Sequence, residues 1–143
     1  MSQIKTILVA VDGSPNSDRA VRHSLDMVAS GFATEVHFLN VQPSLRGAIA
    51  SFVNREQIDS YHRDEGNKAL ASAVELAGKA SVSAQVHIGV GRQGEVIRDF
   101  AKKLGARMVV MGTRGHTGLS GVLLGSVAQD VIAHVDVPVT LVK

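Results

Sequence analysis

The stretch Met111-Gly112-Thr113-Arg114-Gly115, followed after nine further residues by Gly125-Ser126, decides the fold of this chain. The run before it, Arg107–Met111, is short, apolar and β-branched, as expected of a strand buried on both faces. The run after Ser126 has apolar residues at helical spacing. Glycines let a loop turn sharply and approach a ligand, and a helix N-terminus offers unpaired N–H groups to an anion. A strand, a glycine-rich loop and a helix start therefore predict a phosphate-binding loop.

Strands and helices are expected to alternate along the whole chain. The first helix has Ser14 as its cap and Pro15 in its first turn. A later, long helix is expected to turn one apolar face inward, made of Ala69, Leu70, Ala73, Val74 and Ala77. The expected strands are Ile4–Val11, Glu35–Val41, Val82–Val90, Arg107–Met111 and Val137–Val142, and the expected helices run from Ser14 to Gly31, over Arg55–Gly78 and Glu95–Leu104, and from Ser126 onward. Strands joined by helical crossovers predict an α/β fold, an open five-stranded parallel sheet with helices on both faces, as a single domain over residues 1–143.

The composition argues against several classes of function. The formal net charge is only +2, from 15 basic and 13 acidic residues, so no strong positive field favours nucleic acid. Tryptophan is absent and Tyr61 is the single tyrosine, so stacking of bases on aromatic side chains is not expected either. The absence of cysteine excludes disulfides and thiolate metal sites and fits a reducing compartment. We therefore expect a cytoplasmic protein with no signal peptide, no membrane span and no nucleic-acid partner.

In open parallel sheets, ligands bind beyond the carboxyl ends of the strands, where the strand order reverses. This rule directs attention to Val11-Asp12-Gly13, to Asn40-Val41-Gln42 and to the residues from Gly112 onward. Asp12 could accept hydrogen bonds from ribose hydroxyls or an adenine amine, or it could be a turn residue that accepts backbone N–H groups. Val41 could offer its backbone N–H and C=O to an adenine edge, or it could be a core residue.

Two nucleotide-binding motifs are incomplete. Residues Gly89–Gly94 match the dinucleotide fingerprint, but the acidic residue expected about twenty residues later is missing, because that position falls near Arg114. No Gly-Lys-Ser/Thr follows Gly112, so the lysine that a Walker loop places on the β- and γ-phosphates is absent. Arg114 and His116 could neutralise phosphate charge or lie in solvent. Any hydrolysis of a bound nucleotide is therefore expected to be slow.

Three segments resemble the universal stress protein family, over essentially the whole chain. They are Ile7–Ser14, the spacing Met111-Gly112-x2-Gly115-x9-Gly125-Ser126, and Val137-Pro138-Val139. The glycine spacing is typical of the branch of the family that binds ATP. The resemblance implies a Rossmann-like sheet of strand order 3-2-1-4-5, with the reversal between the first and fourth strands. Together with the residues above, it implies a site made of Ala10, Val11, Asp12, Val41, Met111, Gly112, Arg114, Gly115, Gly125, Ser126 and Val127.

The favoured function is an ATP-binding regulatory or stress-response protein, in which the nucleotide stabilises or switches a dimer. The resemblance implies that Asp12 and Val41 meet the adenosine, while the glycines, Ser126 and Val127 line the ribose and phosphates. Mg²⁺ could accompany the triphosphate, although no paired acids predict a dedicated metal site. A slow nucleotide hydrolase or phosphotransferase and a nucleotide-independent scaffold are the alternatives.

The last strand is expected to form a homodimer. In the implied strand order it lies at the edge of the sheet, where the apolar residues Val137, Val139 and Leu141 would border unpaired backbone groups. Antiparallel pairing with the same strand of a second copy would cover this edge and obey two-fold symmetry. The dimers of the family imply the same arrangement. The alternative is an edge covered by the loops of its own chain.

Overall fold

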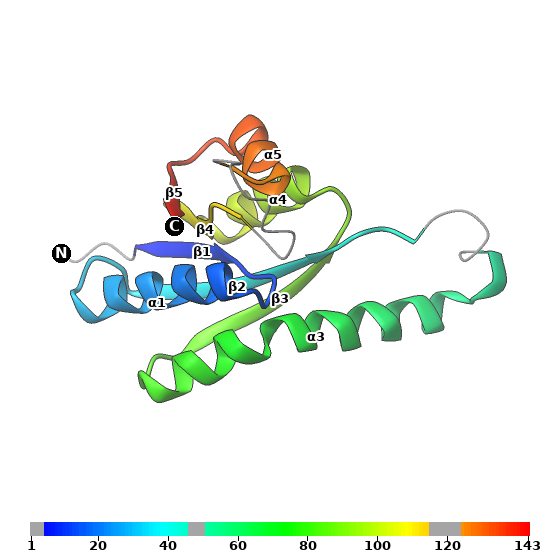
Figure 1. Ribbon diagram of the computed structural model, residues 1–143, viewed down its shortest axis with the longest axis horizontal. Helices are drawn as coiled ribbons and strands as arrows, with labels where there is room; N and C mark the ends of the chain where they lie inside the picture. The colour runs from blue at the N-terminus through cyan, green and yellow to red at the C-terminus, as the bar shows by residue number, and fades with distance from the viewer. Residues whose placement is uncertain (1–4, 46–50, 115–123) are drawn as a thin grey trace.

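The computed structural model describes residues 5–45, 51–114 and 124–143, and within them it shows an open α/β sheet (Figure 1). Its five strands are parallel and lie in the order β3-β2-β1-β4-β5, which confirms the predicted topology. The elements are β1 (Thr6–Ala10), α1 (Pro15–Ala29), β2 (Glu35–Gln42), α3 (Arg55–Lys79), β3 (Ala84–Val90), α4 (Gln93–Leu104), β4 (Met108–Gly112), α5 (Ser126–His134) and β5 (Val139–Val142). The chain adds β2 and β3 on one side of β1 and then β4 and β5 on the other, so the strand order reverses between β1 and β4.

Helices cover both faces of the sheet. In Figure 1, α1 and α3 lie along one face, and α4 and α5 lie on the other. Side chains alternate along a strand, so Phe38 and Leu39 of β2 enter different cores, and both are fully buried. Ile7 and Leu8 of β1 are divided between the two cores in the same way. Burial on both faces explains why the central strands are continuous apolar runs in the sequence.

The helix ends follow from local sequence. The Ser14 side chain caps α1 by accepting a hydrogen bond from the Ser17 N–H at 3.1 Å, and Pro15 is the first helical residue. Asn54 caps α3 in a capping box, which explains why the helix begins at Arg55 as predicted. At the C-terminus of α4, the cap residue is Gly105, whose φ of +66° is a left-handed conformation that favours glycine.

Several strand and helix starts differ from the prediction. β1 is shorter than expected and begins at Thr6. β3 begins two residues later than expected, because Ser81 adopts a turn with a φ of +55° before the strand can pair. β5 begins at Val139 instead of Val137, since Pro138 has no N–H to donate. α4 begins at Gln93, two residues earlier than expected, with Arg92 as its cap residue.

The buried face of α3 is narrower than the sequence suggested. Leu70, Ala73 and Ala77 are buried as predicted, whereas the Val74 side chain is 50% exposed. α3 packs over β2 and β3 at the edge of the sheet, so a single line of residues along the helix meets the core. Gly66 lies on this line, where an added Cβ would be 2.6 Å from the Ile88 side chain. Val74 falls outside the line and faces solvent.

Candidate functional site

A cavity of about 210 Å³ lies at the carboxyl ends of β1, β2 and β4, where the strand order reverses. Every predicted site residue that the structure describes lines it, namely Ala10, Val11, Asp12, Val41, Met111, Gly112, Arg114, Gly125, Ser126 and Val127. Two candidates, Gly115 and His116, lie outside the described residues. The lining also includes Asn40, which the sequence placed at the end of the second strand, and four residues that the sequence did not single out, namely Ser17, Leu39, Gln93 and Ala128.

Asp12 occupies the turn between β1 and α1. Its carboxylate Oδ1 accepts the Ser14 N–H at 2.9 Å, and its own N–H donates to the Ser17 hydroxyl at 3.1 Å. The turn role that the sequence left open is therefore correct. The same residue also lines the cavity, so the turn holds its carboxylate at the end of β1.

The end of β2 presents two polar groups next to the buried Val41 side chain. The Asn40 side chain is itself buried, donates to the Val11 carbonyl at 2.8 Å and accepts from Gln42 at 2.7 Å. The Val41 carbonyl accepts a hydrogen bond from the Gln93 carboxamide Nε2 at 3.1 Å. Asn40 therefore ties the ends of β1 and β2 together, and Gln93 ties the start of α4 to β2.

Asn16, in the first turn of α1, organises the chain after β4. Its Oδ1 accepts the Arg114 N–H at 2.7 Å, and its Nδ2 donates to the Val142 carbonyl at 3.2 Å. Asn16 is buried, and a Cβ added to Gly112 would collide with its carboxamide. The glycine in the phosphate-loop motif is thus required by close packing against α1. The sequence signal for this contact is an asparagine in the first turn of a helix, on the side that faces the sheet.

The N-terminus of α5 lies on the β4 side of the cavity. Gly125 is its cap residue, and the Gly125 N–H donates to the Thr113 carbonyl at 2.7 Å. The cap forms no side-chain hydrogen bond, and the first turn of α5 carries no acidic residue. Because Ser126 and Val127 both line the cavity, this turn brings N–H groups and a partial positive charge to it. Arg114, which is exposed, is the one cationic residue among the described lining residues.

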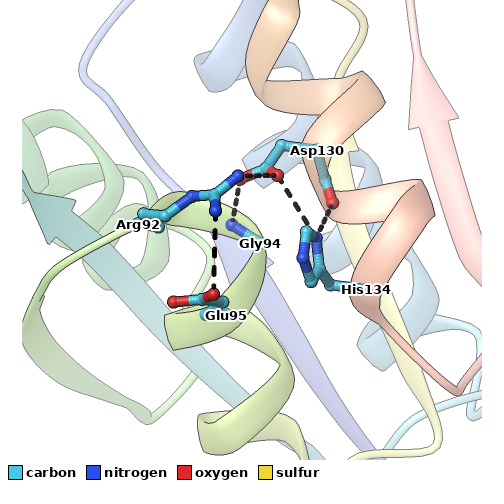
Figure 2. A network of polar contacts seen from close by, with 5 residues as sticks. All are labelled: Arg92, Gly94, Glu95, Asp130 and His134. Atoms are coloured by element: carbon cyan, nitrogen blue, oxygen red, sulfur yellow. Dashed lines mark hydrogen bonds and ion pairs between the residues drawn. The ribbon is translucent and has the colours of Figure 1, made fainter.

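A polar network holds α4 against α5 (Figure 2). The Asp130 carboxylate accepts the Gly94 N–H at 2.7 Å and lies 3.6 Å from the Arg92 guanidinium, which is 3.8 Å from Glu95. Nδ1 of His134 lies 2.8 Å from the Asp130 carbonyl and 3.2 Å from its carboxylate. A Cβ on Gly94 would be 2.5 Å from the Asp130 carbonyl oxygen, so the two helices approach this closely only because residue 94 is glycine.

The histidines of β2, β3 and α3 lie outside the cavity lining. Nδ1 of His37 and Nε2 of His87 are 2.8 Å apart, and burial, followed by the nearby His37 and Lys103, lowers the pKa of His87. His62 is buried, and among the described residues neither of its ring nitrogens has a hydrogen-bond partner. Within the ranges that the structure describes, no three His, Cys, Asp or Glu residues are grouped to hold a metal ion. No helix in those ranges is long and apolar enough to cross a membrane.

The sequence comparisons point to one family. The sequence pattern described as the universal stress protein family matches residues 3–143. Universal stress protein MJ0531 of Methanocaldococcus jannaschii is 34% identical over 142 residues, covering 97% of this chain and 82% of the relative. Universal stress protein Sll1388 of Synechocystis is 32% identical over 149 residues, covering 96% of each chain.

Solved structures share the fold along the whole chain. The hypothetical protein MJ0577 superposes with a TM-score of 0.79 at 26% identity, covering 99% of this chain and 97% of the other. The universal stress protein of Archaeoglobus fulgidus, solved in complex with dAMP, superposes with a TM-score of 0.71 at 25% identity and full coverage of both chains. By sequence pattern, by its relatives and by its strand order, the chain belongs to the universal stress protein family.

Proposed function

We propose that this protein binds ATP in the cavity between β1 and β4 and acts in the cytoplasm as a nucleotide-dependent regulatory or stress-response protein. The observation that carries the proposal is the lining of that cavity. It brings Asp12 and Val41, which suit an adenosine, together with Gly112, Gly125 and the first turn of α5, which suit phosphates. The dAMP complex of the Archaeoglobus fulgidus relative supports an adenine nucleotide as the ligand.

The phosphate end combines three sources of attraction. The first turn of α5 supplies N–H groups and a positive helix end, Ser126 adds a hydroxyl donor, and Arg114 adds a full positive charge. Gly112 and Gly125 keep side chains away from the backbone at the two ends of the loop. Mg²⁺ would be held mainly by the phosphates themselves, with Asp12 as the carboxylate in the lining.

Calorimetric titration of the purified protein with ATP tests the proposal. We expect micromolar affinity, about −8 kcal/mol. Gly125→Val puts a branched side chain at the α5 cap and should weaken ATP binding by at least about tenfold. Gly78→Val is the matched control, because Gly78 is exposed on α3 and an added Cβ there meets no atom within 4 Å. Unchanged affinity in a folded Gly125→Val variant would remove the α5 N-terminus as the phosphate site.

Two further measurements separate the alternatives. Heat extraction of the purified protein should release an adenine nucleotide, whereas a nucleotide-independent scaffold would release none. Turnover of bound ATP should stay below about 1 s⁻¹, the lower end for kinases, because the loop motif lacks the Walker lysine. Faster turnover that Arg114→Ala abolishes while ATP binding persists would favour an enzyme instead.

We also propose a homodimer through β5. Within the described residues this strand pairs on one side only, with β4. The N–H groups of Val109 in β4 and of Thr113 directly after it donate to the Pro138 and Val142 carbonyls. Alternation along a strand then turns the backbone groups of Val139 and Leu141 toward the edge. An antiparallel β5 from a second copy would pair with them. The side chains of Val137, Val139 and Leu141 already pack partly buried against the core beneath α5, so the expected contact is made largely through the backbone.

A further inference from the structure

Gln93 lies on the side of the cavity that β2 and α4 form. Gln93 is the first residue of α4, is partly buried and lines the cavity beside Asn40 and Val41. Its Nε2 donates to the Val41 carbonyl at 3.1 Å, across 52 residues of sequence. This is the one hydrogen bond of the Gln93 side chain among the described residues. The carboxamide is therefore hydrogen-bonded to the end of β2, where the base of a nucleotide would bind.

The Val41 carbonyl determines which way the carboxamide is turned. A carbonyl oxygen can only accept, so the Gln93 side chain must present its NH₂ group to Val41. A flipped carboxamide would put two oxygens against each other at this contact. The Oε1 atom is consequently the group that Gln93 has left to offer, and it is an acceptor.

The two residues on either side of Gln93 both contact α5. The Arg92 guanidinium and the Gly94 N–H both contact the Asp130 carboxylate of α5 (Figure 2). Gly94 has no room for a Cβ against α5, so the first turn of α4 cannot shift closer. A side chain carried by a turn fixed in this way loses little conformational freedom when it binds a ligand.

We propose that Gln93 selects the base of the bound nucleotide, favouring a purine with a 6-amino group over one with a 6-oxo group. The exocyclic amine of adenine has two N–H bonds, and the acceptors at this wall are Gln93 Oε1 and the second lone pair of the Val41 carbonyl. A 6-oxo purine such as hypoxanthine places an oxygen against these acceptors and leaves them without donors, which costs affinity. The inference rests on the proposed binding of ATP in this cavity.

Calorimetric titrations with ATP, inosine triphosphate and purine riboside triphosphate test the role of Gln93. Purine riboside has neither a 6-amino nor a 6-oxo group, so its triphosphate gives the reference affinity without any contribution from position 6. Wild-type protein should bind ATP about tenfold more tightly than purine riboside triphosphate, and inosine triphosphate more weakly still. Gln93→Met keeps the length of the side chain but removes its acceptor oxygen, so it should reduce the preference for ATP while leaving the affinity for purine riboside triphosphate unchanged; the Val41 carbonyl, which remains an acceptor, should keep part of the preference.

Two more variants make the result interpretable. Gln93→Glu keeps acceptor oxygens and a side chain favoured in the first helical turn, but it has no donor to hold them at the Val41 carbonyl, so it should fold and show a smaller preference for ATP than the wild type. Gln129→Met is the matched control: the Gln129 Nε2 also donates to a backbone carbonyl at 3.1 Å, that of Leu124, but Gln129 is exposed and does not line the cavity. It should keep the wild-type ratio of affinities.

The outcomes separate this inference from the proposed function. Tight binding of all three triphosphates with equal affinity by the wild type would overturn the role of Gln93 and leave the nucleotide site standing. The same holds if Gln93→Met and Gln93→Glu both keep the wild-type ratio. Failure of the wild type to bind any of the three would overturn the proposed function and the inference together.

Discussion

The Asn16 carboxamide oxygen accepts the backbone N–H of Arg114 at 2.7 Å, although 98 residues separate the two in sequence. The same carboxamide donates to the Val142 carbonyl at the end of β5. One side chain at the start of α1 therefore connects the chain that follows β4, which lines the cavity, with the strand at the edge of the sheet. Asn16 therefore contacts both the proposed nucleotide site, through Arg114, and the proposed dimer strand, through Val142.

Asn16→Ala should destabilise the protein and weaken ATP binding. The change removes the acceptor of the Arg114 N–H and one of the two donors to the Val142 carbonyl, which still accepts the Thr113 N–H, at a cost of about 1–3 kcal/mol in the free energy of unfolding. Urea denaturation measures this cost. Asn67→Ala, at an exposed position of α3, is the matched control and should change little. Equal stability of the two variants would show that the buried carboxamide is not a structural tie.

Gly112→Ala and Gly78→Ala should change stability in opposite directions. At Gly112 a Cβ collides with the Asn16 carboxamide, so overpacking should cost about 1–3 kcal/mol. At Gly78, on the exposed side of α3, a Cβ meets open space, and alanine should stabilise the helix by roughly 0.5–1 kcal/mol. Thermal denaturation of both variants checks this. A Gly112→Ala protein as stable as the wild type would mean that α1 can move away from β4.

Asp130→Ala should loosen the start of α4. The substitution removes the acceptor of the Gly94 N–H and the partner of the Arg92 guanidinium, and loss of a helix cap typically costs about 0.5–2 kcal/mol. Asp130→Asn keeps an acceptor oxygen and should lose less. Asp136→Ala removes an exposed carboxylate 3.5 Å from Lys102 and should have little effect on unfolding by urea. If Asp130→Ala behaves like Asp136→Ala, the network in Figure 2 does not hold the helix.

Val139→Pro should shift the protein from dimer to monomer without unfolding it. Proline is tolerated at the first residue of a strand, where it removes one edge-facing N–H and blocks pairing by a second strand. Light scattering should give twice the 15.1 kDa chain mass for the wild type and about the single mass for the variant. Circular dichroism is the control for folding. A wild-type protein that is monomeric at micromolar concentration, with and without ATP, would rule out the β5 interface.

Stability should fall on acidification because of His87. Its pKa in the folded protein is lowered from 6.5, so the unfolded chain binds this proton more readily than the folded chain does. The free energy of unfolding should be highest above about pH 7 and decrease as the pH drops through 6.5, levelling off below the lowered pKa. His87→Gln should flatten this decrease, as followed by urea denaturation across the range.

The sequence by itself determined the parts of this protein whose causes are local. The apolar run of β1, the Ser14 cap with Pro15, the capping residue Asn54 and the closing Gly105 each specify an element through neighbouring residues. The glycine spacing around β4 and α5 likewise indicated which residues gather at one cavity. This information lies in short-range hydrogen bonds and in the spacing of the apolar residues, and both can be inferred from the sequence alone.

Only the tertiary structure decided the contacts that hold the cavity in shape. Asn16 meets Arg114 across 98 residues, Gln93 meets Val41 across 52, and Asn40 meets Val11 across 29. Each of these partners is an ordinary backbone group, which has no signature in the sequence. Strand pairing and helix packing bring them together, because a buried polar side chain must find whichever donor or acceptor the fold places beside it. The exposure of Val74 has the same origin, since the width of a buried helix face depends on what the helix packs against.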